Sequence, residues 1–136
     1  MRPNFSGLWE LIRANSDFGF LPPPQLRLDE IMQEDPQLHI RTRQRDAGGD
    51  VTINRDLIIG GEASKIMIRG RARRVSAYWD EAVLVVETSS EVSGKVRRIE
   101  DRWTLDAAAD WLTIERLHEQ PGGPVRQRLR LRRRAE

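Results

Sequence analysis

Hydrophobic and polar residues alternate with a period of two along much of the chain. The alternating sets are Leu26, Leu28, Glu30 and Met32; Leu38, Ile40 and Thr42; and Val51, Ile53, Arg55 and Leu57. Successive side chains of a strand point to opposite faces, so this alternation is typical of strands that bury one face. The pattern predicts half-buried β-strands, and no segment has the period of a helix longer than a turn or two.

Turn-forming residues separate the strands at short and regular intervals. Glycine pairs stand at 48–49 and 60–61, Gly70 and Gly94 follow further along, and Asp35-Pro36 precedes the third strand. Such residues favour the tight turns of β-hairpins. The strands are predicted near residues 6–12, 25–33, 37–45, 50–59, 63–69, 73–79, 83–89, 95–105, 111–119 and 124–133.

The length of 136 residues suits one domain with its own core, and residues 1–136 are predicted to form a single domain. Sequential hairpins of similar length favour an all-β fold, a closed antiparallel up-and-down barrel of about ten strands, because closure removes exposed sheet edges. The one long connection, from Arg13 to Pro24, contains three successive prolines. Proline fixes φ and lacks an N–H donor, so we expect an extended crossover without a helical lid.

The segment Phe5-Ser6-Gly7-Leu8-Trp9 resembles the Gly-x-Trp opening of the calycins, the superfamily of lipocalins and fatty-acid-binding proteins. Much of the remaining chain is similar to a group of bacterial lipocalin-like domains. The segments that carry this similarity are Ser16-Asp17-Phe18-Gly19, Ala77-Tyr78-Trp79-Asp80, Leu84-Val85-Val86-Glu87, Arg102-Trp103-Thr104-Leu105, Leu112-Thr113-Ile114-Glu115 and Pro121-Gly122-Gly123. The resemblance implies an up-and-down barrel in which Trp9 plugs one end.

Two features of fatty-acid-binding proteins do not carry over to this chain. Those proteins hold a ligand carboxylate with an Arg-x-Tyr pair in the last strand, where the inward positions here are Gln127 and Leu129. They also cover one end of the barrel with a helix-turn-helix, and the proline-rich crossover departs from that pattern. The ligand contacts and the entrance must therefore come from other residues of this chain.

The last three predicted strands place polar side chains on the face that also carries the core. The inward polar residues are Arg97, Asp101, Arg116, His118 and Gln127, and Trp103 lies on the same face. In one interpretation, Arg116 with His118 and Gln127 binds the head group of an apolar ligand, because Arg is suited to bidentate capture of a carboxylate. In the other, Asp101 pairs with Arg97 or Arg116, and the network is purely structural.

Catalysis and cofactor binding have little support in the sequence. There is no serine nucleophile elbow, no cysteine and no phosphate-binding glycine loop, so the chain is not expected to be an enzyme. An enzymatic alternative would need Asp101 and His118 as an acid–base pair. His39 has the parity of the outer face, so a pair of histidine ligands is not expected, and we predict neither metal nor haem nor another cofactor.

The charge pattern argues against nucleic acid as a partner. Lys and Arg number 23 and Asp and Glu 21, which leaves a net charge of only +2. The outer face of the last strand carries Arg126, Arg128, Arg130 and Arg132, which are expected to pair with Glu115 and Glu119. This face has few aromatic residues on which bases could stack.

No apolar run is long enough to span a membrane, no signal peptide is visible, and a cytoplasmic location is expected.

The sequence thus leads to one main hypothesis and one alternative. The main hypothesis is a barrel that binds a small apolar, anionic, fatty-acid-like ligand, with Arg116, His118, Arg97, Asp101, Gln127 and Trp103 as the ligand-binding residues. The alternative is a structural or protein-interaction barrel with no small-molecule ligand. The two differ in whether the interior holds a connected cavity or is filled by side chains. The pattern gives no indication of the oligomeric state.

Overall fold

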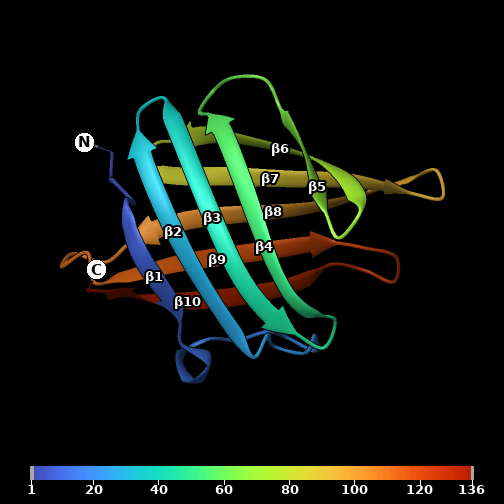
Figure 1. The fold of residues 1–136 in the computed structure, drawn as a ribbon, viewed down its shortest axis with the longest axis horizontal. Helices are drawn as coiled ribbons and strands as arrows, with labels where there is room; N and C mark the ends of the chain where they lie inside the picture. Colours follow the sequence, from blue (N-terminus) through green and yellow to red (C-terminus); the bar gives the residue numbers. More distant parts are fainter. Residues whose placement is uncertain (1, 136) are drawn as a thin grey trace.

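Ten antiparallel strands make up almost all of the regular structure (Figure 1). The computed structural model describes residues 2–135. The strands are β1 (Gly7–Leu11), β2 (Leu26–Glu34), β3 (Gln37–Asp46), β4 (Gly49–Ile58), β5 (Ser64–Ile68), β6 (Arg71–Asp80), β7 (Val83–Val92), β8 (Lys95–Leu105), β9 (Trp111–Glu119) and β10 (Val125–Arg134). The prediction of an all-β fold of about ten strands is confirmed. None of the helices in the described part of the chain is long and apolar enough to span a membrane.

The strands form one sheet that curls into a nearly closed barrel. The hydrogen-bonded order is β4-β3-β2-β1-β10-β9-β8-β7-β6-β5, so β1 joins the first strands to the last. In Figure 1, β2, β3 and β4 cross in front of β6 to β9 at a steep angle. No ladder joins β4 to β5, and this seam is bridged by bonds such as Gly60 N–H to the Ala77 carbonyl at 2.7 Å. Closure is therefore less complete than the sequence suggested.

The side-chain parity of β2 is the opposite of the one the sequence suggested. Leu26 and Met32 lie on the outer face and are 37% and 58% exposed. The inner face carries Arg27, Asp29 and Ile31, all of which are buried. A one-residue shift in parity moves every side chain to the other face. The prediction failed because the barrel interior is charged at this point, and the charged residues there satisfy each other.

One end of the barrel is filled by aromatic and aliphatic side chains. Phe5, Trp9 and Trp103 are fully buried, and the Phe5 and Trp103 rings meet edge to face with centroids 5.5 Å apart. The Trp9 indole N–H donates to the Phe5 carbonyl at 2.9 Å. The expectation that Trp9 plugs an end of the barrel agrees with this placement. This closed end is the apolar core of the molecule.

Gly7 and Trp9 share a partner at the closed end that the sequence did not indicate. The Arg133 guanidinium lies over the Trp9 ring, with its carbon 4.2 Å from the ring centroid, and it donates to the Ser6 and Ala109 carbonyls at 2.9 Å each. A Cβ on Gly7 would lie 2.3 Å from the Arg133 Nη1 atom. Gly7 is needed here because any side chain would displace the arginine that covers Trp9.

The crossover between β1 and β2 contains no α-helix. It begins with one 3₁₀ turn, η1 (Arg13–Asn15), after which Asp17 pairs with Arg128 of β10 through two backbone hydrogen bonds of 2.8 and 2.7 Å. The rest of the segment, which includes the three prolines, has no regular structure. The expected absence of a helical lid is confirmed for this connection.

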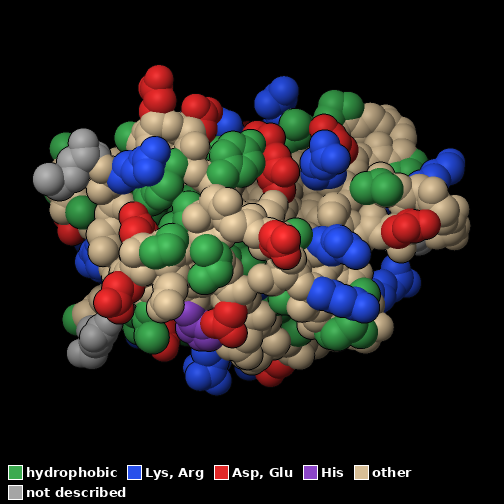
Figure 2. Space-filling view, turned by 90° about the horizontal axis from the view of Figure 1, so that it is seen from above, with side chains coloured by type: hydrophobic (Ala, Val, Ile, Leu, Met, Phe, Trp, Pro, Cys, Tyr) green, Lys and Arg blue, Asp and Glu red, His purple; other side chains and the backbone are tan. Residues whose placement is uncertain are grey.

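The outer surface carries charges of both signs. Arg128 pairs with Glu115 across β10 and β9 at 3.3 Å, as parity predicted. Trp111 faces outward, as expected, and the Arg130 guanidinium stacks over its ring with its carbon 4.8 Å from the ring centroid. Basic and acidic side chains are interspersed on the face in Figure 2.

Candidate functional site

Arg116 and Asp101 form a bidentate ion pair inside the barrel. They are opposite each other in the β8–β9 ladder, and the Arg116 Nε and Nη2 atoms donate to the two Asp101 oxygens at 2.7 and 2.9 Å. Burial works to raise the pKa of Asp101, but the charge and hydrogen bonds of Arg116 outweigh it and hold that pKa below its usual value. Asp101 is therefore a carboxylate, and Arg116 already has an anionic partner.

A second buried ion pair lies on β2. The Arg27 Nη2 atom donates to Asp29 Oδ2 at 2.9 Å, and the Arg27 Nε atom donates to Oδ1 at 3.3 Å. The two residues are two positions apart, so they share the inner face of the strand. Burial raises the pKa of Asp29, but Arg27 lowers it by more, with smaller contributions from Arg55 and Thr42. Asp29 is therefore a carboxylate as well.

Arg55 of β4 is the third interior arginine and has no carboxylate partner. Arg55 is 8% exposed, and its Nη2 atom donates a hydrogen bond to the Thr42 hydroxyl at 3.3 Å. The Nε atom is buried and has no hydrogen-bond partner among the described residues. Burial lowers the pKa of Arg55 to about 10, so the side chain is still cationic at neutral pH.

These five residues form what we call the central charge cluster: Arg27, Asp29, Arg55, Asp101 and Arg116. The negative charges of the two aspartates raise the pKa of Arg55, whereas the positive charges of Arg27 and Arg116 lower it. Three guanidinium groups and two carboxylates leave one positive charge uncompensated. Buried charges are normally paired, so this excess is the unusual feature of the interior.

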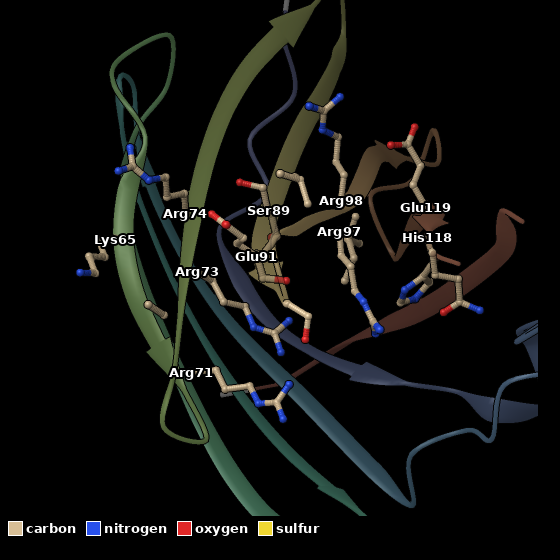
Figure 3. Close-up of a pocket in the computed structure, with 17 residues that line it drawn as sticks. Lys65, Arg71, Arg73, Arg74, Ser89, Glu91, Arg97, Arg98, His118 and Glu119 are labelled. Carbon is tan, nitrogen blue, oxygen red and sulfur yellow. The ribbon is translucent and has the colours of Figure 1, made fainter. Parts of the chain in front are cut away.

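A cavity of about 920 Å³ opens at the end of the barrel opposite the aromatic core. Its wall comes from β6, β7, β8 and the end of β9. Arg71, Arg73 and Arg97 point into it, whereas Arg74 and Glu119 point away (Figure 3). The Arg73 Nε atom is buried and has no hydrogen-bond partner within the described residues. This mouth cavity therefore presents guanidinium groups to whatever enters it.

His118 lies between the mouth cavity and the central charge cluster. It lines the cavity and is two residues from Arg116 on the same face of β9. Its Nε2 atom is 3.2 Å from the Gln127 side-chain oxygen, and the Gln127 amide donates to the Phe18 carbonyl at 3.0 Å. Burial, and then the positive charge of Arg116, lower the pKa of His118 below 6.5, which favours the neutral ring at neutral pH.

The acid–base pair of the enzymatic alternative is not formed. Asp101 accepts both hydrogen bonds from Arg116, and His118 contacts Gln127. His39 is on the outer face, where it pairs with Asp56. No group of three or more metal-ligating side chains occurs within residues 2–135.

The structure brings together some of the sequence-predicted site residues and separates others. Asp101, Arg116, His118 and Gln127 form one contiguous group inside the barrel. Arg97 was expected in the interior but is exposed, because it lies near the start of β8 on the rim of the mouth cavity. Trp103 was expected beside a ligand tail, but it is fully buried in the aromatic end and does not line the mouth cavity.

Sequence reasoning missed the half of the cluster that comes from β2 and β4. Arg55 alternates with Val51, Ile53 and Leu57, so its inward parity was visible and indicated a buried arginine. Arg27 and Asp29 were hidden by the outward leucines of β2. Their spacing of two, with opposite charges, was the signal that could have revealed an interior pair.

Solved structures match nearly the whole chain. A secretory abundant heat soluble protein from Ramazzottius varieornatus matches with a TM-score of 0.73 at 13% identity, over 95% of this chain and 94% of that one. A zebrafish ileal bile acid-binding protein complexed with cholic acid has a TM-score of 0.66 at 11% identity, over 96% and 98% of the two chains. The fatty-acid-binding protein of Manduca sexta has a TM-score of 0.57 at 11% identity, over 95% of this chain and 99% of that one.

These similarities establish the fold and leave the activity open. The chain has a β-barrel fold like that of the fatty-acid-binding proteins, with identities too low to transfer a function. No protein-family model and no curated protein matches the sequence.

Proposed function

We propose that the chain binds a small molecule with an apolar body and one anionic group, which enters through the mouth cavity. The observation that carries this proposal is the set of inward arginines, Arg71, Arg73 and Arg97, around a space of about 920 Å³. Pockets for small ligands usually have volumes of about 300–1,000 Å³. The cavity thus has the size of a ligand site, and its inward charges are positive.

Arg73 is the mouth residue that most needs an anion. Its Nε atom is buried and unpaired, and burial together with the charge of Arg71 lowers its pKa. A carboxylate would satisfy this donor and offset the repulsion between the two arginines, because the guanidinium fork matches carboxylate geometry. The lining is mainly polar, and its apolar part comes from Ile99, Val96, Ala72 and the methylene groups of the arginine side chains.

The solved structures of similar fold support the same ligand class. The zebrafish protein is complexed with cholic acid, and the Manduca sexta protein is a fatty-acid-binding protein. For this chain the ligand class is a proposal, supported by the mouth arginines and by the fold. A fatty-acid-like molecule has the two properties that the cavity requires, an apolar body and a single carboxylate.

The proposal can be tested by titrating the protein with a fluorescent long-chain carboxylate at physiological ionic strength. The double variant Arg73→Gln/Arg97→Gln removes two inward charges. Arg74→Gln/Arg98→Gln is the matched control, since it removes two charges from adjacent positions on the same strands. We expect the inward variant to bind at least about tenfold more weakly than wild type, and the control to bind like wild type.

Two results would contradict the proposal. Equal losses in both double variants would show that only the general positive field attracts the probe. No saturable binding by the wild type, either of this probe or of a neutral apolar one, would favour the alternative of a structural or protein-interaction barrel.

A further inference from the structure

The central charge cluster is a second feature of the interior, deeper than the mouth cavity. Its two aspartates are both occupied: Asp29 accepts two hydrogen bonds from Arg27, and Asp101 accepts two from Arg116. Among residues 2–135, neither carboxylate hydrogen-bonds to Arg55, and the side-chain partner of Arg55 is the Thr42 hydroxyl. The protein thus provides two anions for three cations and places all of them in the interior.

Burying the Arg55 charge without a counter-charge is energetically unfavourable. A buried cation loses its hydration, and without a counter-charge that loss is not recovered. Thr42 offers a neutral acceptor at 3.3 Å, which is a weak substitute. The buried and unpaired Nε atom of Arg55 leaves one arm of the guanidinium fork available.

The cluster is next to the mouth cavity along β9. The Arg116 side chain points inward from β9 and is 19% exposed, so it is not sealed from solvent. His118, which lines the mouth cavity, comes next on the same face of β9. An anion is therefore expected to approach the cluster from the side of the mouth cavity, past His118.

We infer that the centre of the barrel contains a subsite for a singly charged anion, held by the unpaired guanidinium of Arg55. The preferred chemistry is a monocarboxylate or a halide. One negative charge neutralises the cluster, whereas a dianion such as sulfate would leave a net negative charge in the interior. The anion is either the head group of the apolar ligand or a free ion, and the two sources give different experimental results.

The test measures chloride binding to the intact protein by the line width of the chloride NMR signal, with formate, acetate and sulfate as competitors at equal ionic strength. We expect the folded wild type to broaden the signal, formate and acetate to reverse the broadening, and sulfate to have little effect. Arg55→Met should weaken chloride binding at least about tenfold. Arg73→Gln, which changes only the mouth cavity, is the control and should retain binding.

Arg55→Lys keeps the charge and loses the planar fork, so it should bind chloride more weakly than wild type but better than Arg55→Met. This variant and the wild type decide the question if Arg55→Met fails to fold. No broadening by the folded wild type beyond that of the urea-unfolded protein would overturn the inference. Equal broadening by wild type and Arg55→Met would overturn it too.

The long-chain carboxylate separates the two sources of the anion. If it displaces chloride from the wild type, the subsite binds the head group of the ligand. If it binds without displacing chloride, the subsite takes a free monoanion. Failure of the mouth variants to affect probe binding would contradict the proposed function alone, because chloride binding at Arg55 is measured without the probe.

Discussion

At the closed end of the barrel, Phe5, Trp9 and Trp103 fill the interior with apolar side chains, whereas the centre holds three arginines and two aspartates. Both regions are buried, and both come from strands of the same sheet. Burial of apolar surface stabilises the closed end directly. Burial of charge in the centre is offset only by good ion-pair geometry, and replacing such pairs with apolar groups is often neutral or stabilising.

The two regions have different roles, since the closed end determines stability and the centre is available for function. The aromatic end is built from apolar side chains that are fully buried, so it contributes mainly to folding. The centre contains a buried arginine without a counter-charge, which lowers stability unless an anion binds to it. Removing a buried side chain at the closed end should therefore lower stability, whereas in the centre the result should depend on whether the substitution removes the uncompensated Arg55 or one half of an ion pair.

The largest effect is expected at the closed end. Trp9→Ala should lower the free energy of unfolding by about 3–5 kcal/mol, because it removes a fully buried aromatic ring and leaves a cavity. Trp111→Ala is the control, since Trp111 lies on the outer face and stacks on Arg130. Urea unfolding of the three proteins measures the difference. A loss below about 1 kcal/mol for Trp9→Ala would show that the closed end does not determine stability.

The second effect is the loss of one half of a buried ion pair. Asp101→Asn should lower the free energy of unfolding by about 3 kcal/mol, because it leaves Arg116 without its counter-charge. Asp80→Asn breaks the ion pair with Arg102, which is more exposed than the Asp101–Arg116 pair. This substitution should lower the free energy of unfolding by less than about 1 kcal/mol. Denaturant unfolding at neutral pH compares the two. Similar losses in both variants would contradict the special status of the centre.

The contrast between the two regions also explains how far the sequence could predict the structure. Strand boundaries followed from period-two alternation and turn residues, since these signals are local. The Arg116–Asp101 pair followed from parity, and pairing was one of the two interpretations that parity allowed. The choice between them depended on Arg27, Asp29 and Arg55, which approach from the other side of the barrel.

Positions that depend on three-dimensional closure were not predictable in this way. Arg97 has inward parity, but its place near the end of a long hairpin puts it on the rim. In β2 the leucines suggested an inward face that the structure turns outward, because hydrophobicity is an unreliable guide where the interior is charged. The Arg133 guanidinium covers the ring of Trp9, although the two residues are 124 positions apart in the sequence.

The third prediction compares the effects on stability of removing two different arginines of the central charge cluster. Arg55→Met should leave the free energy of unfolding unchanged or raise it by up to about 2 kcal/mol in the absence of ligand, because an uncompensated charge is removed. Arg116→Met should lower it by about 3 kcal/mol, because Asp101 then loses its partner. Unfolding in a buffer free of small monoanions measures both. A loss in Arg55→Met as large as in Arg116→Met would show that Arg55 is already satisfied within the barrel.

The smallest effect concerns His118, at the boundary between the cluster and the mouth. Burial and Arg116 lower its pKa below the ordinary value of 6.5. Between the folded pKa and 6.5 the unfolded chain therefore binds more protons than the folded one, so stability rises with pH across this window. The contribution of His118 is fully present above pH 6.5 and is lost as the pH falls through the folded pKa.

His118→Gln keeps a polar side chain beside Gln127 and removes the titrating ring. Urea unfolding at about pH 7.5 and about pH 5 should show a smaller loss of stability on acidification for this variant than for wild type. His39→Gln is the control, because the outward His39 does not contact the cluster and its loss should leave the contribution of His118 in place. If His118→Gln and wild type lose the same stability, His118 is not sensitive to the positive charge of the centre. A reduced loss would instead show that burial and the positive charge of Arg116 together hold the pKa of His118 below its ordinary value at the edge of the mouth cavity.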